Sequence, residues 1–508
     1  MDIINSIVER LRTPFSWLTT PVIISTFLVG LCVVLLVDYF RLKRNKIPGP
    51  RGVPFFGYLP FFGKNPQKTF FNLRKRYGDI FSIQMGSFPA VVINGKDLIR
   101  EALVTSGDDF AGRPNFYTTQ LLDDGESVTF GTFGPRRVLQ RKIASNVLYV
   151  FANARTNPLE DIIQEEVERL CSDFGKMKGA AFDPSEGIYV SVGSVLYQLC
   201  YGRNEEIRND ENFLQFVKVS GDFTKFTGAG NPVDVMPWLR FAMPWKLTKF
   251  WAVVRKLEVI IESKLKEEAA TYSKDNRRHL TDGLLKAAIE VEADPEHGLT
   301  GDHVRHVMGD ITSAGFETLS TTLTWAVLLL ANNLTVQRKV HEEIDDVVGS
   351  RSPRLDDKPN LPYTMATINE IMRFADIVPL AVPHAATRDT ELRGYKIREG
   401  TILIPNFYSV SHDEQTWGDP NNFRPERYLD ENGELDKTKT DLYTPFSLGR
   451  RKCLGEFLAR MEVFLFFSAI LQRCEFRKPA SVEEYNLEGS FGLTIKPEPY
   501  DVAVTLRT

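Results

Sequence analysis

The sequence predicts a mainly α-helical protein with small β-sheets (α+β), built as one large domain behind an N-terminal transmembrane helix. Three observations predict this fold class. Most of the middle of the chain has helical periodicity, short alternating apolar runs occur in two places, and an uncharged apolar run lies near the amino end. Although the 508 residues would suggest about three domains, no linker, low-complexity tract or internal repeat divides the chain after Lys46.

The composition is compatible with a large enzyme but does not indicate which reaction it catalyses. Apolar residues make up 43% and charged residues 25%, which argues against disorder, collagen-like sequence and a multi-span membrane protein. With 62 Lys+Arg against 66 Asp+Glu, the net charge of -4 gives no basic surplus for nucleic acid. Five cysteines form no CxxC pair and leave an odd count, so reduced thiols are expected rather than a disulfide scaffold.

The amino terminus predicts a single-span membrane anchor. Residues 13–37 carry no charge, and they are followed by Arg41, Lys43, Arg44 and Lys46. A run of this length can span a bilayer, and the cations after it place that side in the cytoplasm. The alternatives are a buried core helix or a cleaved signal peptide, but the mixed charge before the run disfavours the latter. We therefore expect an anchor with a basic stop over residues 1–46 and a catalytic domain over residues 47–508, joined by a proline-stiffened hinge.

The elements of the domain follow from periodicity. Strands are expected early and again between residues 384 and 404, and helices fill most of the remainder around one contiguous core. The expected early strands are residues 80–85 and 90–93, and the expected long helices are residues 159–177, 247–272, 301–332, 336–348 and 456–472.

A loop near the carboxyl end places one cysteine before the last helix. A lone cysteine is usually a small buried apolar residue. Here Gly449 permits a turn with positive φ, and Gly455 leaves room for a flat ligand against the backbone. Cys453 is expected just before a helix amino terminus, where free N–H groups and nearby cations stabilise a thiolate. An anionic sulfur on a loop is a good iron ligand.

This loop matches all five fixed positions of the pattern FxxGxRxCxG, and so resembles the haem-ligand loop of the cytochrome P450 family. The resemblance runs from Pro48 to the end of the chain and implies the cytochrome P450 fold and haem b as cofactor. It also implies that Cys453 is the axial thiolate and metal ligand, a ligand type that favours O–O cleavage. Arg451 would pair with a haem propionate, Phe446 would shield the sulfur, and Gly449 would shape the turn.

Two upstream segments are similar to structural motifs of the same family. Glu370 and Arg373 form an ExxR pair on one helix face, and residues 423–428 look like the family's PERF segment. Together Glu370, Arg373 and Arg427 resemble a buried ion triad. We expect these three residues to fix the cysteine loop rather than to take part in the reaction.

The helix expected over residues 301–332 contains Gly315, Glu317 and Thr318. A packing role for the glycine, and a hydrogen bond from Thr318 to its own helix, would explain the sequence without function. By the resemblance, Gly315 opens a groove for dioxygen, while Glu317 and Thr318 form the acid–alcohol pair that relays protons.

Further haem contacts are implied at His384 and Arg141. His384 would donate to a propionate, and Arg141 fits the arginine of the family's WxxxR motif. Arg137 stands at the tryptophan position of that motif. The sequence leaves open whether Arg137 supplies an additional cation or points to solvent.

The family's recognition segments predict a pocket for a flat, apolar molecule such as a polycyclic arene or a steroid. Each of these side chains has core packing as its alternative role. The predicted pocket residues are Phe116, Tyr117, Phe226, Ala314, Phe316, Val378, Leu380, Val382, Phe491 and Leu493.

The implied reaction inserts one oxygen atom of O2 into an apolar substrate. Since the chain has no GxGxxG after a strand, the electrons are expected from NADPH through the membrane-bound cytochrome P450 reductase, with cytochrome b5 as a second partner. The likeness is greatest to the animal microsomal aryl-hydrocarbon hydroxylase and steroid 17α-hydroxylase branches, which implies the endoplasmic reticulum membrane. Two alternatives remain open at this stage: a haem-thiolate isomerase or lyase acting on lipid hydroperoxides, and a non-catalytic haem carrier or sensor.

Overall fold

The computed structural model describes residues 47–120, 126–152, 159–228, 232–273, 278–291 and 301–507, with Leu122 and a few positions between residues 25 and 33. Most of the predicted anchor lies outside these residues. Among the described residues, one helix is long and apolar enough to cross a membrane, but 83% of its most apolar 18-residue stretch is buried within the domain. That helix is the central core helix α14 (Gly301–Asn332).

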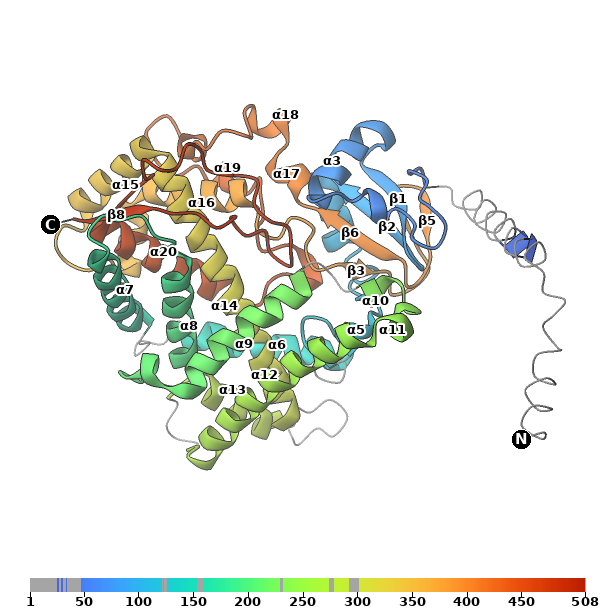
Figure 1. Cartoon of the computed structure of the whole chain (residues 1–508), viewed down its shortest axis with the longest axis horizontal. Helices are drawn as coiled ribbons and strands as arrows, with labels where there is room; N and C mark the ends of the chain where they lie inside the picture. Colours follow the sequence, from blue (N-terminus) through green and yellow to red (C-terminus); the bar gives the residue numbers. More distant parts are fainter. Residues whose placement is uncertain are drawn as a thin grey trace, which may run out of the picture.

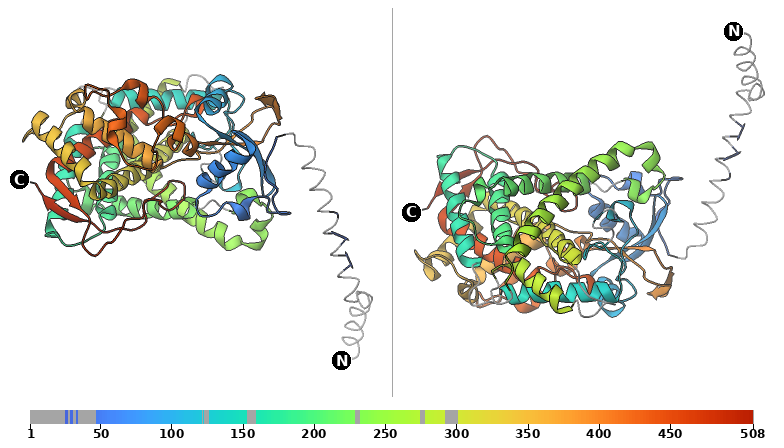
Figure 2. Two further views of the ribbon diagram at one scale, coloured as in Figure 1. Left: turned by 90° about the horizontal axis from the view of Figure 1, so that it is seen from above. Right: turned by 90° about the horizontal axis from the view of Figure 1, so that it is seen from below.

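Helices form most of the domain, and a small sheet lies at one end of it (Figures 1 and 2). The long helices besides α14 are α3 (Pro66–Tyr77), α6 (Pro135–Ala152), α7 (Leu159–Lys176), α8 (Ser185–Tyr201), α9 (Glu211–Gly228), α12 (Pro244–Ala270), α13 (Leu280–Val291), α15 (Leu334–Val347), α16 (Pro362–Ala375) and α20 (Glu456–Arg473). The short helices are α4 (Lys96–Arg100), α5 (Tyr117–Gln120), α10 (Pro232–Val235), α11 (Leu239–Ala242), α17 (Tyr408–Ser411), α18 (Glu414–Trp417) and α19 (Lys437–Thr440).

The main sheet has the order β1-β2-β6-β3. Strands β1 and β2 are antiparallel, β2 and β6 are parallel, and β3 returns antiparallel to β6. Strand β6 is buried along its whole length, and its first four residues are apolar without alternation, as is usual for a strand covered on both faces. The strands of the main sheet are β1 (Ile80–Met85), β2 (Phe88–Asn94), β3 (His384–Ala385) and β6 (Ile402–Asn406). Two further antiparallel pairs are β4 (Thr390–Leu392) with β5 (Tyr395–Ile397) and β7 (Cys474–Arg477) with β8 (Ala503–Leu506).

The chain joins the domain on β1. Ile47 is buried, and the Pro48 carbonyl accepts a 2.7 Å hydrogen bond from the Ser82 N–H. A Cβ at Gly49 would overlap the carbonyl oxygen of Ser82, so only glycine fits here. The predicted hinge is therefore docked against the sheet.

The apolar core is divided into three clusters instead of the single contiguous core that we expected. The largest surrounds α14 and includes side chains of α7, α8 and α20. Two smaller clusters lie on either side of the main sheet. The prediction missed this division because periodicity identifies which residues are buried, but not which ones contact each other. Within the largest cluster, the buried thiols of Cys171 and Cys474 are 3.3 Å apart.

Candidate functional site

The cysteine loop is folded against the 101–105 turn and the start of α20. Gly449 has φ +73°, and a Cβ there would overlap the carbonyl oxygen of Leu103, so the turn requires glycine. The Cys453 N–H donates to the Phe446 carbonyl at 2.9 Å, which closes the loop. The Phe446 ring lies 4.7 Å from the Arg460 guanidinium of α20. Cys453 thus sits three positions before α20 begins at Glu456, as the sequence predicted.

The Cys453 thiol faces an opening that protein surrounds. Its side chain is exposed, yet burial is the main influence on its pKa and raises it. A thiol that reaches an opening enclosed by protein accounts for both observations. Backbone N–H groups of Gly455 and Glu456 bond to the sulfur and counteract the rise in the Cys453 pKa. A Cβ at Gly455 would meet nothing within 4 Å, so the opening extends along the backbone.

Buried and partly buried cations gather beside this loop. Burial, together with the nearby charges of Arg141 and Arg137, lowers the pKa of Arg451 to about 9. Burial and the charges of Arg451 and Arg141 also hold the Arg113 pKa well below its usual value. Like charges this close destabilise one another unless an anion joins them. The arrangement therefore suits a negatively charged ligand.

Arg451 binds the protein backbone on all three of its nitrogens. It donates to the carbonyls of Ala111 at 2.8 Å, Val128 at 3.1 Å and Gly131 at 2.7 Å. These bonds tie the cysteine loop to the segment before α6. Two of its five guanidinium protons remain for another acceptor, so its predicted propionate contact stays a prediction.

The other predicted haem contacts lie in the same region, together with one that the sequence reasoning missed. His384 Nδ1–H donates to the Phe110 carbonyl at 2.7 Å, and burial followed by the Arg113 charge holds the His384 pKa well below 6.5. Arg141 donates to the Lys452 carbonyl at 2.5 Å. The missed residue is Arg113, which donates to the carbonyls of Thr129, Val382 and Pro383. The sequence signal that could have found Arg113 is the segment Phe110–Pro114, which resembles animal microsomal members of the same family.

The structure resolves the question of Arg137. Its side chain is 5% exposed and bonds to the Glu126 backbone carbonyl, the Gln140 side chain and, at 3.0 Å, the Glu126 carboxylate. It therefore does not point to solvent. Its positive charge is matched by Glu126.

Glu370, Arg373 and Arg427 come together in the interior. The Glu370 carboxylate accepts from Arg373 Nε at 2.7 Å and Nη2 at 2.8 Å, and from Arg427 Nε at 3.0 Å. Arg373 also donates to the Ser411 carbonyl, and Arg427 to the Trp417 carbonyl. This triad connects α16 to the 3-10 turn Pro425–Tyr428 and to the short helices α17 and α18 that precede this turn.

One side of α14 is accessible near the middle of the helix, at Ala314 and Thr318. Ala314 is exposed although Thr312 and Phe316 on either side of it are buried. Thr318 Oγ1, one turn later, donates to the Ala314 carbonyl at 2.8 Å, which is the bond expected of a threonine without a further role. Because this bond uses the hydroxyl proton, the oxygen lone pairs remain available to accept.

Close packing against α8 explains why position 315 is a glycine. A Cβ there would lie 3.3 Å from Leu196 Cδ2 of α8, tighter than most such contacts. Helix α14 is continuous across this residue. The predicted dioxygen groove is therefore not needed to explain the glycine and remains a prediction.

Glu317 is 4% exposed and points to α8 and the C-terminal loop. Lys496 Nζ lies 2.8 Å from its Oε1, and Thr494 Oγ1 donates to the same atom at 3.0 Å. Glu317 and Thr318 are thus neighbours in sequence, but their side chains have different surroundings in this structure.

Comparison with known proteins agrees with this geometry. A family model described as Cytochrome P450 matches residues 47–504. The chain belongs to the cytochrome P450 family. It is 38% identical to Cytochrome P450 1A1 of Rattus norvegicus over 487 residues, covering 93% of this chain and 92% of that protein. It is 36% identical to Cytochrome P450 1A1 of Homo sapiens over 490 residues, with coverages of 92% and 95%. It is 38% identical to Cytochrome P450 1A2 of Rattus norvegicus over 462 residues, covering 89% of each.

This cytochrome P450 is a monooxygenase that uses haem with a cysteine thiolate ligand. The chain's own residues fit the cofactor. An exposed thiol with two N–H donors suits an iron ligand, and crowded buried cations suit two propionate groups.

The predicted substrate residues of the P450 divide into two groups. Ala314, Phe116, Tyr117 and Phe491 are at least partly exposed, as are Val378, Leu380, Val382 and Leu493. Phe316 is 1% exposed and packs against Tyr189 and Phe216 at ring distances of 5.4 and 5.8 Å. We therefore leave Phe316 out of the pocket, because helical periodicity puts it on the side of α14 away from Ala314. The Phe226 side chain lies outside the described residues.

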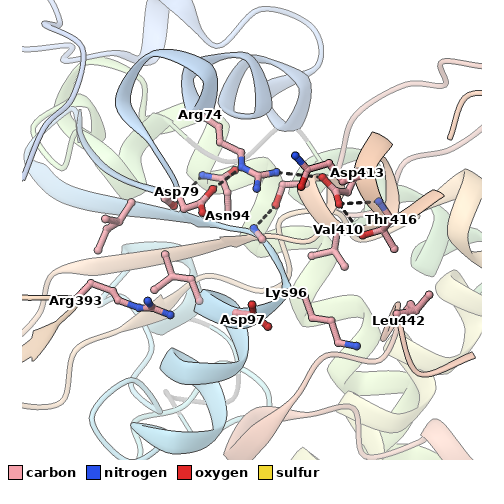
Figure 3. Close-up of a pocket in the computed structure, with 15 residues that line it drawn as sticks. Arg74, Asp79, Asn94, Lys96, Asp97, Arg393, Val410, Asp413, Thr416 and Leu442 are labelled. Carbon is pink, nitrogen blue, oxygen red and sulfur yellow. Dashed lines mark hydrogen bonds and ion pairs between the residues drawn. The ribbon is translucent and has the colours of Figure 1, made fainter. Parts of the chain in front are cut away.

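A separate surface groove of the P450, of about 480 Å³, lies beside the main sheet (Figure 3). Its charges are balanced: Arg74 pairs with Asp79 at 2.5 Å and with Asp413 at 3.7 Å. None of the predicted site residues lines it. Further lining residues are Asn94, Lys96, Asp97, Arg393, Val410, Thr416 and Leu442.

Proposed function

We propose that Cys453 is the axial ligand of the haem iron in a membrane-bound monooxygenase of flat, apolar molecules. The exposed Cys453 thiol, at a helix amino terminus with the Gly455 and Glu456 N–H groups on its sulfur, carries this proposal. Donors to the sulfur stabilise the thiolate that the metal requires. When bound, haem supplies the activation of O2, of which one atom enters the substrate and the other leaves as water.

Four groups, of which two are buried and two are partly buried, would hold the haem propionates. Arg113, Arg141, Arg451 and His384 lie close enough for their charges to influence one another's pKa values. Two carboxylates placed among them would relieve this repulsion with charge-assisted hydrogen bonds. The Glu370–Arg373–Arg427 triad would act at a distance, by fixing the segment that leads to the cysteine loop.

Glu317 and Thr318 would deliver the protons that the reduction of O2 consumes. Thr318 Oγ1 is placed to accept a proton or hydrogen bond, since its own hydrogen is given to Ala314. Glu317 is the adjacent acid on α14, with access to solvent through Lys496, whose side chain is 35% exposed. General acid groups of this kind contribute about 10²–10⁴-fold to a rate.

The substrate would lie above Ala314. Because the small side chain of Ala314 is exposed, the helix surface leaves room there for a flat ligand. Apolar contacts to that ligand would come from Phe116, Leu380 and Phe491. The Phe116 ring already contacts Phe88 edge-to-face at 6.1 Å. A polycyclic arene or steroid has the shape and polarity for such a site.

Electrons would come from NADPH through cytochrome P450 reductase, with cytochrome b5 as an additional donor. The exposed cations Arg136, Lys142 and Lys452 lie on α6 and on the cysteine loop. Beside them the exposed rings of Tyr149 and Phe457 contact at 5.3 Å and join α6 to α20. An aromatic centre with a basic rim suits an acidic protein partner. Arg137 and Arg451, which belong to the same two segments, are buried and take no part in this surface.

Location at the endoplasmic reticulum membrane is supported by an apolar surface at the sheet end. Phe55 and Phe61 are 60% and 47% exposed, and Phe241 and Trp245 are 77% and 55% exposed. The two groups are joined, because the Ser87 N–H of the β1–β2 turn donates to the Val235 carbonyl of α10 at 2.8 Å. Figure 1 shows α10 and α11 beside this sheet. Since Ile47 also docks on β1, the anchor would leave the domain next to aromatic residues that favour a membrane interface.

The haem-ligand proposal is tested by the spectrum of the reduced, CO-bound protein. Cys453→Ala should lose the thiolate-type Soret band and all turnover, whereas Cys200→Ala, at a buried cysteine of α8, should keep both. A thiolate band in the Cys453→Ala protein would refute the assignment. Turnover of lipid hydroperoxide without any NADPH-driven reaction would favour the lyase alternative.

The proton-relay proposal is tested separately. Thr318→Ala should keep the spectrum but release more hydrogen peroxide for each NADPH oxidised. Unchanged coupling of NADPH oxidation to product would count against the role of Thr318.

A further inference from the structure

One carboxylate of α14 binds the turn formed by residues 127–131, which precedes α6. Asp310 Oδ2 accepts from the Val128 N–H at 2.6 Å and from the Thr129 N–H at 3.2 Å. The Ser127 hydroxyl donates to Asp310 Oδ1 at 2.9 Å. The same hydroxyl oxygen accepts from the N–H groups of Thr129 and Phe130, each at 3.1 Å. Three successive N–H groups of the 127–131 turn are therefore bound by Asp310 and Ser127.

The carbonyl groups of the 127–131 turn bind the cations beside the cysteine loop. The Val128 and Gly131 carbonyls accept from Arg451 at 3.1 and 2.7 Å. The Thr129 carbonyl accepts from Arg113 Nε at 2.9 Å. Among the described residues, the turn thus supplies two of the three backbone acceptors of Arg451 and one of the three of Arg113.

Two peptide groups connect Asp310 to these arginines. In the group between Val128 and Thr129, the C=O accepts from Arg451 and the N–H donates to Asp310. In the next peptide group, the C=O accepts from Arg113 and the N–H donates to the serine hydroxyl that itself binds Asp310. A peptide group between a cation and an anion is polarised by both, so each of its hydrogen bonds strengthens the other.

Asp310 also lies on the same side of α14 as the proposed substrate site. It is one turn before Ala314 and about two turns before Thr318, and all three residues are at least partly exposed. Burial lowers the pKa of Arg141, and the charges of Cys453 and Asp310 oppose this change. The negative charge of Asp310 therefore acts on the cations beside the cysteine loop as well as on the turn.

We propose that Asp310 is a positioning residue for the haem, because it fixes the 127–131 turn that holds Arg451 and Arg113 in place for the propionates. This inference rests on the proposed roles of the two arginines. Among the described residues, Arg113 binds carbonyls through Nε and Nη1, which leaves its Nη2 for a propionate. Without Asp310, the buried Val128 N–H would lose its acceptor, and the turn would shift to find another.

Resonance Raman spectroscopy of the ferric, haem-loaded protein tests the positioning, because the bending modes of the haem propionates shift with the hydrogen bonds that the propionates accept. Asp310→Ala should lower the frequency of these modes, and it should speed the transfer of haem to apomyoglobin by about tenfold. Asp310→Asn keeps an acceptor for the Val128 N–H and should stay closer to the unchanged protein in both measurements. Unchanged propionate modes in Asp310→Ala, or an asparagine variant no better than the alanine variant, would overturn the inference.

Asp234→Ala is the matched control. Asp234 of α10 is 8% exposed and also accepts from a backbone N–H and a hydroxyl, those of Thr118, at 2.7 and 2.6 Å. Its loss should lower the melting temperature but leave the propionate modes and the haem transfer rate unchanged. Equal changes in Asp234→Ala and Asp310→Ala would mean that general destabilisation is responsible, and would refute the role of Asp310.

Ser127→Ala provides the test if Asp310→Ala does not fold. This variant removes one donor to the Asp310 carboxylate and the acceptor of two N–H groups of the 127–131 turn. It should shift the propionate modes and the haem transfer rate in the same directions as Asp310→Ala, by smaller amounts. No change in either measurement would refute the inference.

Two arginine variants separate failure of this inference from failure of the proposed haem site. Arg451→Lys and Arg113→Lys keep the charge but not the fork of donors, so the propionate modes should shift in both. Unchanged modes in both variants would refute the propionate assignment itself. Shifted modes in either of them, with unchanged modes in Asp310→Ala, would refute only the role of Asp310.

Discussion

Arg137 Nη2 and Glu126 Oε2 are 3.0 Å apart, and this ion pair connects α6 to the segment that precedes it. The arginine is buried at 5% exposure, whereas the Glu126 side chain is 36% exposed. The same segment provides the Val128 and Gly131 carbonyls that bind Arg451. Arg137 therefore supports the cysteine loop indirectly, at a motif position where the family pattern has tryptophan.

Arg137→Met should destabilise the protein by about 1–3 kcal/mol, because it leaves the Gln140 amide and the Glu126 carbonyl without their donor. Glu126→Gln is the matched control, since it removes the charge pair but leaves both of those acceptors to Arg137. Its cost should be below about 1 kcal/mol. Denaturant unfolding followed by haem absorbance measures both values. Equal losses would mean that the ion pair, and not the buried hydrogen bonds, is the important contact.

Gly449→Ala should prevent the cysteine loop from closing. Its φ of +73° strains any other residue, and the new Cβ would overlap the Leu103 carbonyl oxygen. Gly400→Ala is the control, because Gly400 has φ +74° but nothing within 4 Å of its Cβ position. We expect the control to lose only about 1–2 kcal/mol of stability and to bind haem normally. Haem content per protein and the reduced CO spectrum measure the difference, and normal haem content in Gly449→Ala would contradict the steric argument.

Elements with strong local patterns were predictable from the sequence. The bounds of α14 agree with the expectation, and α7, α12, α15 and α20 agree to within three residues. Strands β1 and β2 also appear where alternation indicated them. Their signal is local, since side-chain periodicity and glycine or proline boundaries lie within each segment.

Side-chain direction was not predictable in the same way. Phe316 lies two residues from Ala314, and a linear motif places both in the pocket, but the helix turns them to different sides. The partners of Glu317 come from 128 and 177 residues away, at Tyr189 and Thr494. Arg113 was missed for the same reason, because its carbonyl acceptors Val382 and Pro383 lie far along the chain.

Arg427→Met should cost about 3–5 kcal/mol, because it leaves the buried Glu370 carboxylate with less positive charge and frees the Trp417 carbonyl. Arg424→Met is the control. Arg424 pairs with Asp419 at 2.8 Å, but its side chain is 49% exposed, so its loss should cost less than about 1 kcal/mol. The Arg424 backbone N–H, which donates to Glu370 at 2.9 Å, is retained in that variant. Thermal unfolding of the haem-loaded proteins compares them, and similar melting temperatures would exclude a structural role for Arg427.

Glu462 should make the protein less stable as the pH rises. Burial among α20 and its neighbours raises the pKa of this carboxyl from 4.5 to about 8, and its Oε1 has no hydrogen-bond partner among the described residues. Between these two pH values the folded protein keeps a proton that the unfolded chain has released. The free energy of unfolding therefore falls by about 1.4 kcal/mol for each pH unit in this range, and Glu462 contributes no further change above it.

Glu462→Gln removes this titration and nearly preserves the shape of the side chain. Other buried groups, such as Asp376 with a pKa raised to about 6, also contribute to the pH dependence, so the comparison is the difference between the two proteins. The difference in the free energy of unfolding should favour Glu462→Gln increasingly from pH 5 to pH 8. Folded Glu462 must either keep a proton that the unfolded chain releases or carry a buried charge, whereas the glutamine does neither. Denaturant unfolding at several pH values measures it. A difference that is independent of pH would show that Glu462 is ionised in the fold, with its charge compensated by a group outside the described residues.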